Sequence, residues 1–88
     1  MNGSVYIIQS QSSGRYYIGS SRDAEARLRY HNNGWVAATK NRGPWVIKYV
    51  QEYTDIATAR KIENKLKQLK SRVIIEKIIT DQRITIGE

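Results

Sequence analysis

Two tyrosines, an arginine, a histidine and a glutamate are the side chains of this sequence that could act together on a phosphate ester. Arg27 offers a planar fork of donors that matches phosphate oxygens and offsets negative charge developing in a transition state. Tyr6 and Tyr17 are phenols with an ordinary pKa near 10, so they assist proton transfer only beside a cation or a metal-bound water. Without such neighbours, they are sheet aromatics that bury a ring and expose a hydroxyl.

The histidine and the glutamate each have more than one interpretation. His31 could bind phosphate, move a proton, lie buried with both nitrogens bonded, or act as a cation at a helix end. Glu63 follows the apolar Ile62 on a helix, where a carboxylate is costly unless it is paired. It could form a salt bridge to Arg27 or a lysine, or bind Mg²⁺, which often takes one carboxylate plus waters and phosphate oxygens. A lone carboxylate favours one metal ion over two.

The pattern that positions these residues predicts a hairpin followed by a helix. Residues 4–9 and 15–20 are rich in β-branched and aromatic side chains and flank a polar turn, so Tyr6 and Tyr17 would lie on neighbouring antiparallel strands. From residue 24 the apolar spacing is helical, and Gly34 is expected to end this helix. The candidate N-caps are Ser20, Ser21 and Asp23.

A loop, a third strand and two further helices are expected in the rest of the chain. Residues 35–44 have no periodicity, and Trp35 would fill the loop's own small core or stack on a base. Residues 45–53 alternate as a strand, which predicts one face formed by Trp45, Ile47 and Tyr49. Residues 56–70, capped by Thr54 or Asp55, carry an apolar stripe formed by Ala59, Ile62, Leu66 and Leu69.

The C-terminal part repeats the helical pattern over residues 73–79, with Ser71 as the cap, and residues 83–86 form a short strand or fray. The element order β-β-α-β-α-α predicts an α+β fold, a three-stranded antiparallel sheet flanked by helices. No repeat or linker divides the sequence, so residues 1–88 are expected to form a single domain.

Composition narrows the environment and the class of partner. The formal net charge is +7, from 15 Lys and Arg against 8 Asp and Glu, which fits a polyanionic partner such as nucleic acid and a role in solubility alone equally well. The candidate site residues favour nucleic acid. There is no cysteine, which excludes a disulfide framework and fits the cytoplasm. No apolar run reaches the length of a membrane helix, so no membrane association is expected.

The order of these motifs resembles the GIY-YIG nucleases, most of all the small stand-alone bacterial members. Ser4-Val5-Tyr6 and Tyr17-Ile18-Gly19 look like the two halves of the signature, although Ser4-Val5 replaces Gly-Ile. Arg27 and His31 stand where the family has its helix arginine and a second polar residue, and the segment around Glu63 is similar to the family's metal-binding helix. A late asparagine, common in the family, has no counterpart here, because Asn64 adjoins Glu63 and faces elsewhere.

The resemblance implies a metal-dependent endonuclease that hydrolyses phosphodiester bonds of nucleic acid, with DNA as the expected substrate and DNA repair, recombination or mobile elements as context. It implies that Tyr17 helps to activate water with Tyr6 in support. Arg27 would hold the phosphate, and one Mg²⁺ or Mn²⁺ ion would bind Glu63. His31 would have a supporting role. A larger protein partner could supply specificity, since family members often rely on one.

The surface residues and the rival functions complete the set of expectations. The cations expected to follow the nucleic-acid backbone are Lys40, Arg42 and Lys48. A monomer is expected, because the sequence has no heptad seam. One rival is a catalytically inactive nucleic-acid-binding module with the same fold. The other is an interaction domain whose apolar C-terminal helix docks a partner.

Overall fold

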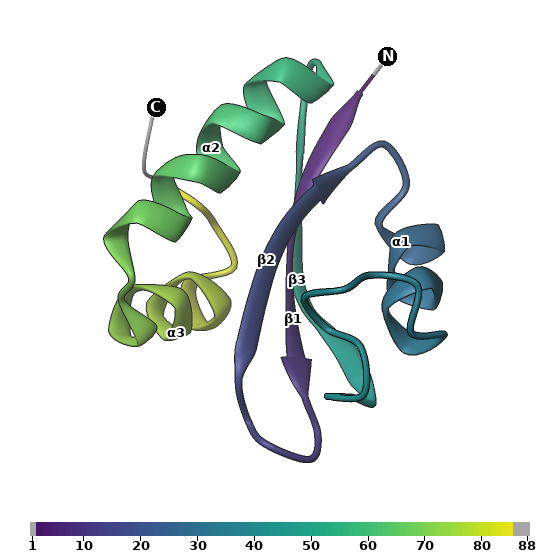
Figure 1. Ribbon diagram of the computed structural model, residues 1–88. Coiled ribbons are helices and arrows are strands. Elements are labelled where there is room, and N and C mark those ends of the chain that lie inside the picture. The colour runs from purple at the N-terminus through teal and green to yellow at the C-terminus, as the bar shows by residue number, and fades with distance from the viewer. Residues whose placement is uncertain (1, 86–88) are drawn as a thin grey trace.

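A central antiparallel sheet separates one helix from two others. The computed structural model describes residues 2–85. In chain order the elements are β1 (Gly3–Ser10), β2 (Tyr16–Ser21), α1 (Ala24–Asn32), β3 (Trp45–Tyr53), α2 (Ile56–Leu69) and α3 (Arg72–Asp81). The strand order is β2-β1-β3, with both pairs antiparallel. Figure 1 shows α1 on one side of the sheet and α2 and α3 on the other. The predicted α+β fold and element order are confirmed.

The central strand β1 supplies both sides of the core, because successive side chains of a strand point to opposite faces. Val5 and Ile7 pack toward α2 and α3, in a cluster of aliphatic side chains. Tyr6 and Ile8 pack toward α1, together with Trp45. All four β1 side chains are buried. The sheet therefore has two differently built faces, and β2 is an open edge between them.

Strand β3 contains an irregularity that changes its predicted faces. Opposite β1, Ile7 pairs with Tyr49 and Ile8 pairs with Ile47, so Lys48 is an extra residue without a partner on β1. Such a bulge shifts the alternation of the strand by one residue. Tyr49 therefore packs with the α2 side, whereas Trp45 and Ile47 pack with the α1 side. The prediction that these three side chains share one face is wrong at Tyr49.

Each helix begins at a side-chain cap that the sequence offered. The caps are Asp23, Asp55 and Ser71, whose oxygens accept from the amides of Ala26, Thr58 and Ile74 at 3.0, 2.7 and 3.2 Å. The apolar stripe of α2 is buried except at its end, because the chain turns at Lys70 in a left-handed conformation (φ 49°). Leu69 is consequently 41% exposed, contrary to expectation.

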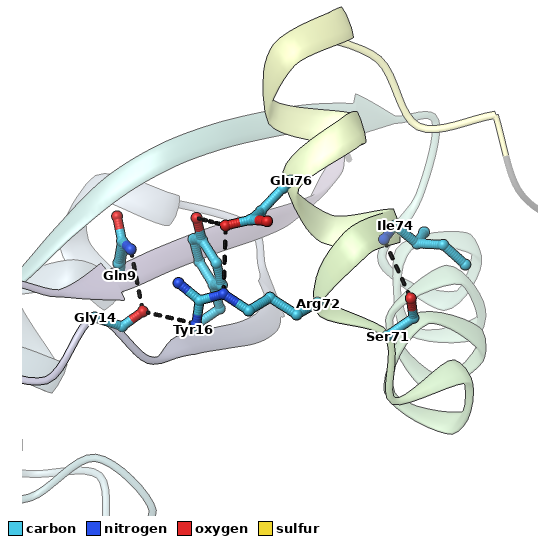
Figure 2. Close-up of polar contacts among 7 residues, drawn as sticks. All are labelled: Gln9, Gly14, Tyr16, Ser71, Arg72, Ile74 and Glu76. Carbon is cyan, nitrogen blue, oxygen red and sulfur yellow. Dashed lines mark hydrogen bonds and ion pairs between the residues drawn. The ribbon is translucent and has the colours of Figure 1, made fainter.

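Helix α3 is fastened to the turn between β1 and β2 by polar contacts (Figure 2). Arg72 donates to the Gly14 carbonyl at 3.2 Å, pairs with Glu76 at 3.3 Å, and lies over the ring of Tyr16 at 4.8 Å. Ile78 of α3 is buried in the aliphatic cluster. The apolar helix that could have docked a partner thus packs on its own sheet through Ile78, while Val73 and Ile74 are exposed.

The segment after α3 neither forms a strand nor frays over residues 83–85. Ile84 is fully buried in the aliphatic cluster. Its amide donates to the Gln51 side chain at 2.7 Å, and its carbonyl accepts from the same side chain at 3.3 Å. Residue 86, the end of the predicted tail strand, lies outside the described residues. No helix within residues 2–85 is both long and apolar enough to cross a membrane.

Candidate active site

The residues predicted for catalysis and metal binding come from β1, β2, α1 and α2 and meet near the open β2 edge of the sheet. Tyr17 pairs with Ile8 and Gly19 pairs with Tyr6, so both tyrosines lie on the α1 face, as predicted. A Cβ atom at Gly19 would collide with the ring of Tyr6. The absence of a side chain at Gly19 therefore lets the Tyr6 ring cross β2 with its hydroxyl toward the edge.

Behind Tyr6 lies a buried line of hydrogen bonds that ends in the loop after α1. The Tyr6 hydroxyl is 2.8 Å from His31 Nε2, and His31 Nδ1 is 2.7 Å from Thr39 Oγ1. The Val36 carbonyl, which can only accept, lies 3.4 Å from Thr39 Oγ1 and favours Thr39 donating to it. His31 Nδ1–H then donates to Thr39, and His31 Nε2 accepts from Tyr6.

The electrostatics of this line keep both rings uncharged. Burial, together with the nearby charge of Arg27, lowers the pKa of His31 to about 4. Burial raises the pKa of Tyr6 to about 12, although a hydrogen bond from Arg27 opposes the rise. His31 is only 2% exposed and both of its nitrogens are bonded. Of its interpretations, the buried and satisfied histidine describes the structure, and a cation at the helix end does not.

Tyr17 occupies the outer, half-buried position of the pair. Its ring centroid lies 5.1 Å from that of His31 and 6.4 Å from that of Trp45, both edge-on. Lys67 Nζ reaches around the β2 edge from α2 to within 5.0 Å of the Tyr17 ring centroid. Within residues 2–85 the hydroxyl of Tyr17 forms no hydrogen bond, in contrast to that of Tyr6.

Glu63 approaches the same edge from α2, on the opposite side of β2. Its Oε1 accepts a short hydrogen bond from Ser20, and its Oε2 lies 2.7 Å from Lys67 Nζ. The lysine partner that the sequence allowed is therefore present, although the side chain of Lys67 is 43% exposed. The spacing Glu63-x-x-x-Lys67 was a signal that could have identified this particular lysine.

The oxygen atoms that the site offers fit one hard cation whose coordination shell is completed by waters and by phosphate oxygens of a substrate. Within residues 2–85 no group of three or more His, Cys, Asp or Glu side chains could hold a metal ion. The Glu63 carboxylate is the one charged oxygen donor that the described site offers, and Mg²⁺ tolerates such a site when waters and phosphate oxygens complete its shell. Lys67 would have to leave Oε2, and its exposure makes that displacement inexpensive.

Arg27 connects the tyrosines to a hollow rich in cations. This hollow, of about 330 Å³, is lined by Ser20, Ser21, Arg22, Arg27, Ile56 and Arg60. None of the three arginines forms an ion pair with a carboxylate of the described residues. Unpaired guanidinium groups on one concave surface are suited to phosphate oxygens.

The side chains predicted to contact the nucleic-acid backbone are not part of this hollow. Lys40, Arg42 and Lys48 are exposed, and none of them lines it. Arg22 and Arg60 were missed at the sequence level, because a basic residue on an exposed helix or turn gives no local sign of the surface to which it belongs. The role of Lys40, Arg42 and Lys48 stays a prediction.

A family model described as the GIY-YIG catalytic domain matches residues 2–78 of this chain. The chain therefore belongs to the GIY-YIG family, a family of nucleases that act on nucleic acid. Among its relatives, a UPF0213 protein of Bacillus cereus is 40% identical over 65 residues, which cover 73% of this chain and 67% of the relative.

Similarity to UPF0213 proteins also appears in a relative of lower sequence identity and in a solved structure. A UPF0213 protein of Halobacterium salinarum is 33% identical over 66 residues, covering 74% of this chain and 84% of its own length. The solution NMR structure of a UPF0213 protein from Bacillus halodurans superposes with a TM-score of 0.56 at 28% identity, covering 91% of this chain and 84% of the other. This agreement supports the fold described above.

Proposed function

We propose that this protein is a metal-dependent endonuclease that hydrolyses phosphodiester bonds, with DNA as its substrate. The observation that carries the proposal is the convergence of Tyr17, Glu63 and Arg27 from three elements at the β2 edge. Lys67 Nζ lies 2.7 Å from Glu63 Oε2 and 5.0 Å from the Tyr17 ring centroid, and Ser20, which donates to Glu63, lines one hollow together with Arg27. An arginine for phosphate, a phenol for water and a carboxylate for a cation are the parts that phosphodiester hydrolysis requires.

Each residue receives a role that follows from its surroundings. Arg27 binds the non-bridging oxygens of the scissile phosphate, from the side of the arginine-lined hollow. Tyr17, whose hydroxyl forms no hydrogen bond within residues 2–85, orients the attacking water and helps to remove its proton. Tyr6 stays protonated because of its raised pKa of about 12, so it positions Arg27 rather than acting as a base. His31 holds Tyr6 in place through its Nε2 atom.

One divalent ion, Mg²⁺ or Mn²⁺, would be held by the Glu63 carboxylate and would stabilise the charge of the leaving oxygen. Ser20 orients that carboxylate by donating to Oε1. DNA repair, recombination or mobile-element movement in the cytoplasm is the proposed context. A larger partner protein supplying specificity remains part of the proposal.

Incubation of the purified protein with supercoiled plasmid, single-stranded DNA, branched DNA and RNA, in Mg²⁺, Mn²⁺ or EDTA, tests this function. We expect cleavage of DNA with either metal and none with EDTA. One set of catalytic residues per monomer should convert supercoiled plasmid to open circles before linear molecules appear. Cleavage that survives EDTA, or no cleavage of any substrate, would refute the proposal.

The second candidate is an inactive nucleic-acid-binding module, and the Glu63–Lys67 ion pair is the observation that favours it. In that case, Glu63 would be satisfied by Lys67 and would have no need of a metal. Nucleic acid would still bind through the arginine-lined hollow, with affinity falling as salt rises by a slope of about 0.9 per neutralised phosphate of duplex DNA. Substitution of Glu63, argued below, separates the two candidates.

A further inference from the structure

The two aromatic side chains that the structure leaves most exposed lie against each other at the end of α1. Trp35 is 68% exposed and Tyr30 is 45% exposed, with ring centroids 5.2 Å apart and ring planes at 65°. A tryptophan is a large, mostly buried side chain in folded proteins. Trp45, the other tryptophan, is 5% exposed and donates its indole N–H to the Thr39 carbonyl at 3.2 Å.

The expectation that Trp35 fills the core of its loop is therefore wrong. Trp45 and Thr39 occupy that interior, and Trp35 is directed to the surface instead. The local backbone fixes this arrangement, because Gly34 adopts a positive φ of 77° and the amide of Trp35 donates to the Tyr30 carbonyl at 3.0 Å. The backbone that carries the exposed ring is thus fixed.

This aromatic pair is continuous with the candidate active site through Arg27. The guanidinium carbon of Arg27 lies 5.7 Å from the centroid of the Tyr30 ring, one helical turn away. The same guanidinium lines the hollow assigned to the scissile phosphate. A cation over one ring, with a second ring at its edge, forms a surface that suits the π face of a nucleobase.

A protein partner explains the pair less well. A stable protein interface needs about 800 Å² on each side, far more than two rings provide. The other large exposed apolar side chains of residues 2–85 are Leu69, Val73 and Ile74. They belong to the end of α2 and to α3, on the opposite side of the sheet from α1 (Figure 1), so they cannot extend the patch.

We propose that Tyr30 and Trp35 form a stacking platform for an unpaired nucleobase next to the phosphate held by Arg27. The proposal rests on the proposed function in taking nucleic acid as the ligand. It goes beyond that function because a base can stack there only when it leaves its own helix. The platform would therefore favour strands with unstacked bases, such as single strands, ends and junctions, over continuous duplex.

The fluorescence of the two tryptophans provides a direct test. A short single-stranded oligonucleotide is added in EDTA, which prevents cleavage, and compared with an abasic strand of equal length that keeps every phosphate. Stacking on Trp35 should quench its emission and protect it from acrylamide with the intact strand only. Trp45 is the internal control, because its buried ring should not respond, and Trp35→Phe shows which tryptophan produces the signal.

Affinity gives the second measurement. Trp35→Ala should weaken binding of the intact strand about tenfold, because stacking of one base on an aromatic ring contributes a factor of about ten to affinity. Its affinity for the abasic strand should equal that of wild type. Leu69→Ala is the matched control, an exposed apolar residue remote from α1, and should change neither affinity. Trp35→Phe keeps a stacking ring and should retain most of the affinity.

Several outcomes would overturn the platform, and they differ from failure of the enzyme. If Trp35→Ala bound the intact strand as tightly as wild type does, stacking would be refuted even if the protein cleaves DNA. An equal loss of affinity for the intact and abasic strands would refute it too. A wild-type dimer that Trp35→Ala dissociates in ultracentrifugation would assign the rings to a second copy of the chain instead. Base-dependent quenching without cleavage in Mg²⁺ would support the platform and refute only the endonuclease. No binding of either strand would refute the platform, and both proposals would fail if, in addition, no substrate were cleaved in Mg²⁺ or Mn²⁺.

Discussion

The two faces of the sheet are built from different chemistry, although one central strand supplies both. The face toward α2 and α3, here called the aliphatic face, buries Val5, Ile7, Ile18, Ala59, Ile62, Leu66, Ile78 and Ile84. The face toward α1, here called the polar face, buries Ile8, Ala24 and Trp45 and, in addition, a hydrogen-bonded line formed by Tyr6, His31 and Thr39. Non-directional burial stabilises both faces, whereas only the second adds a line of directional bonds that fix orientation.

This difference indicates a division of labour within a small chain. A domain of this size has little core to spare, so a buried polar line is tolerated only when each member is satisfied. No buried side-chain nitrogen or oxygen in the described residues lacks a partner. The aliphatic face can then supply most of the stability while the polar face holds Tyr6 and Arg27 in place. Each variant below should affect one side of this division more than the other.

The largest expected effect is on catalysis. Glu63→Gln keeps shape while removing the charge that would hold the metal, so cleavage should fall about a thousandfold, as expected when several kcal/mol of transition-state stabilisation are lost. Plasmid nicking rates measure this, and DNA binding should persist or strengthen because a negative charge has gone. Glu25→Gln, an exposed carboxylate on α1, is the control and should cleave normally. Full activity with a lowered melting temperature would mean that Glu63 serves only as a partner for Lys67.

The next effect belongs to the aliphatic face and should be purely structural. Ile84→Ala empties a fully buried position, which costs about 2–5 kcal/mol of unfolding free energy. In a domain of this size, the melting temperature should fall by roughly 10 °C or more, measured by calorimetry. The cleavage rate per folded molecule, at a temperature where the variant is folded, should match wild type.

Val73→Ala is the matched control for Ile84→Ala, because Val73 on α3 is exposed and its truncation should cost less than about 0.5 kcal/mol. A melting temperature of Ile84→Ala equal to that of Val73→Ala would show that the segment after α3 is not part of the core. Loss of cleavage by folded Ile84→Ala would show that a change in the aliphatic face also affects catalysis.

The polar face should make stability depend on pH through His31. Its folded pKa of about 4 lies below the unfolded value of 6.5, so the unfolded state binds the proton more readily. The contribution of neutral His31 is complete above pH 6.5 and is lost as pH falls toward 4. The total loss is about 3 kcal/mol, with no further change below pH 4. Melting temperatures of wild type and His31→Gln across this range check the prediction.

The difference between the melting temperatures of wild type and His31→Gln at each pH removes the effect of titrations that both proteins share. One of these is the titration of Asp55, whose lowered pKa affects stability below this pH window. The wild-type curve should converge on the variant as pH falls from 6.5 to 4. Parallel curves would mean that His31 is not buried as a neutral ring.

What the sequence could predict was local. The caps Asp23, Asp55 and Ser71 follow from side chains beside the amides they bind, and the helices and hairpin follow from short apolar periods. The placement of Tyr6 and Tyr17 on one face of the sheet needed only the hairpin register. The grouping of the site residues came from a family pattern, since no local property of Glu63 connects it to Tyr17.

What the sequence could not predict depends on partners distant in the chain. The bulge at Lys48 exists only relative to β1, so it cannot be read from an alternating strand pattern. Thr39 gave no sign of its bond to His31, because it lies in a loop without periodicity. The two tryptophans are alike as sequence letters, and only the packed loop decides that Trp45 is buried and Trp35 exposed.

The smallest expected effect lies at the β2 edge, where residues of the two faces meet. Lys67 Nζ is 2.7 Å from Glu63 Oε2, the position that a divalent ion would need, so the ammonium competes with the metal for that oxygen. Because exposed ion pairs contribute about 0.2–1 kcal/mol, Lys67→Gln should tighten Mn²⁺ binding about two- to fivefold. The electron paramagnetic resonance signal of free Mn²⁺ measures this on the protein without DNA. Lys65 is an exposed lysine on the same helix, so Lys65→Gln makes the same change of net charge and serves as the control. Equal Mn²⁺ affinities of the two variants would show that Lys67 does not occupy the metal position, and that it acts on Tyr17 or on DNA alone.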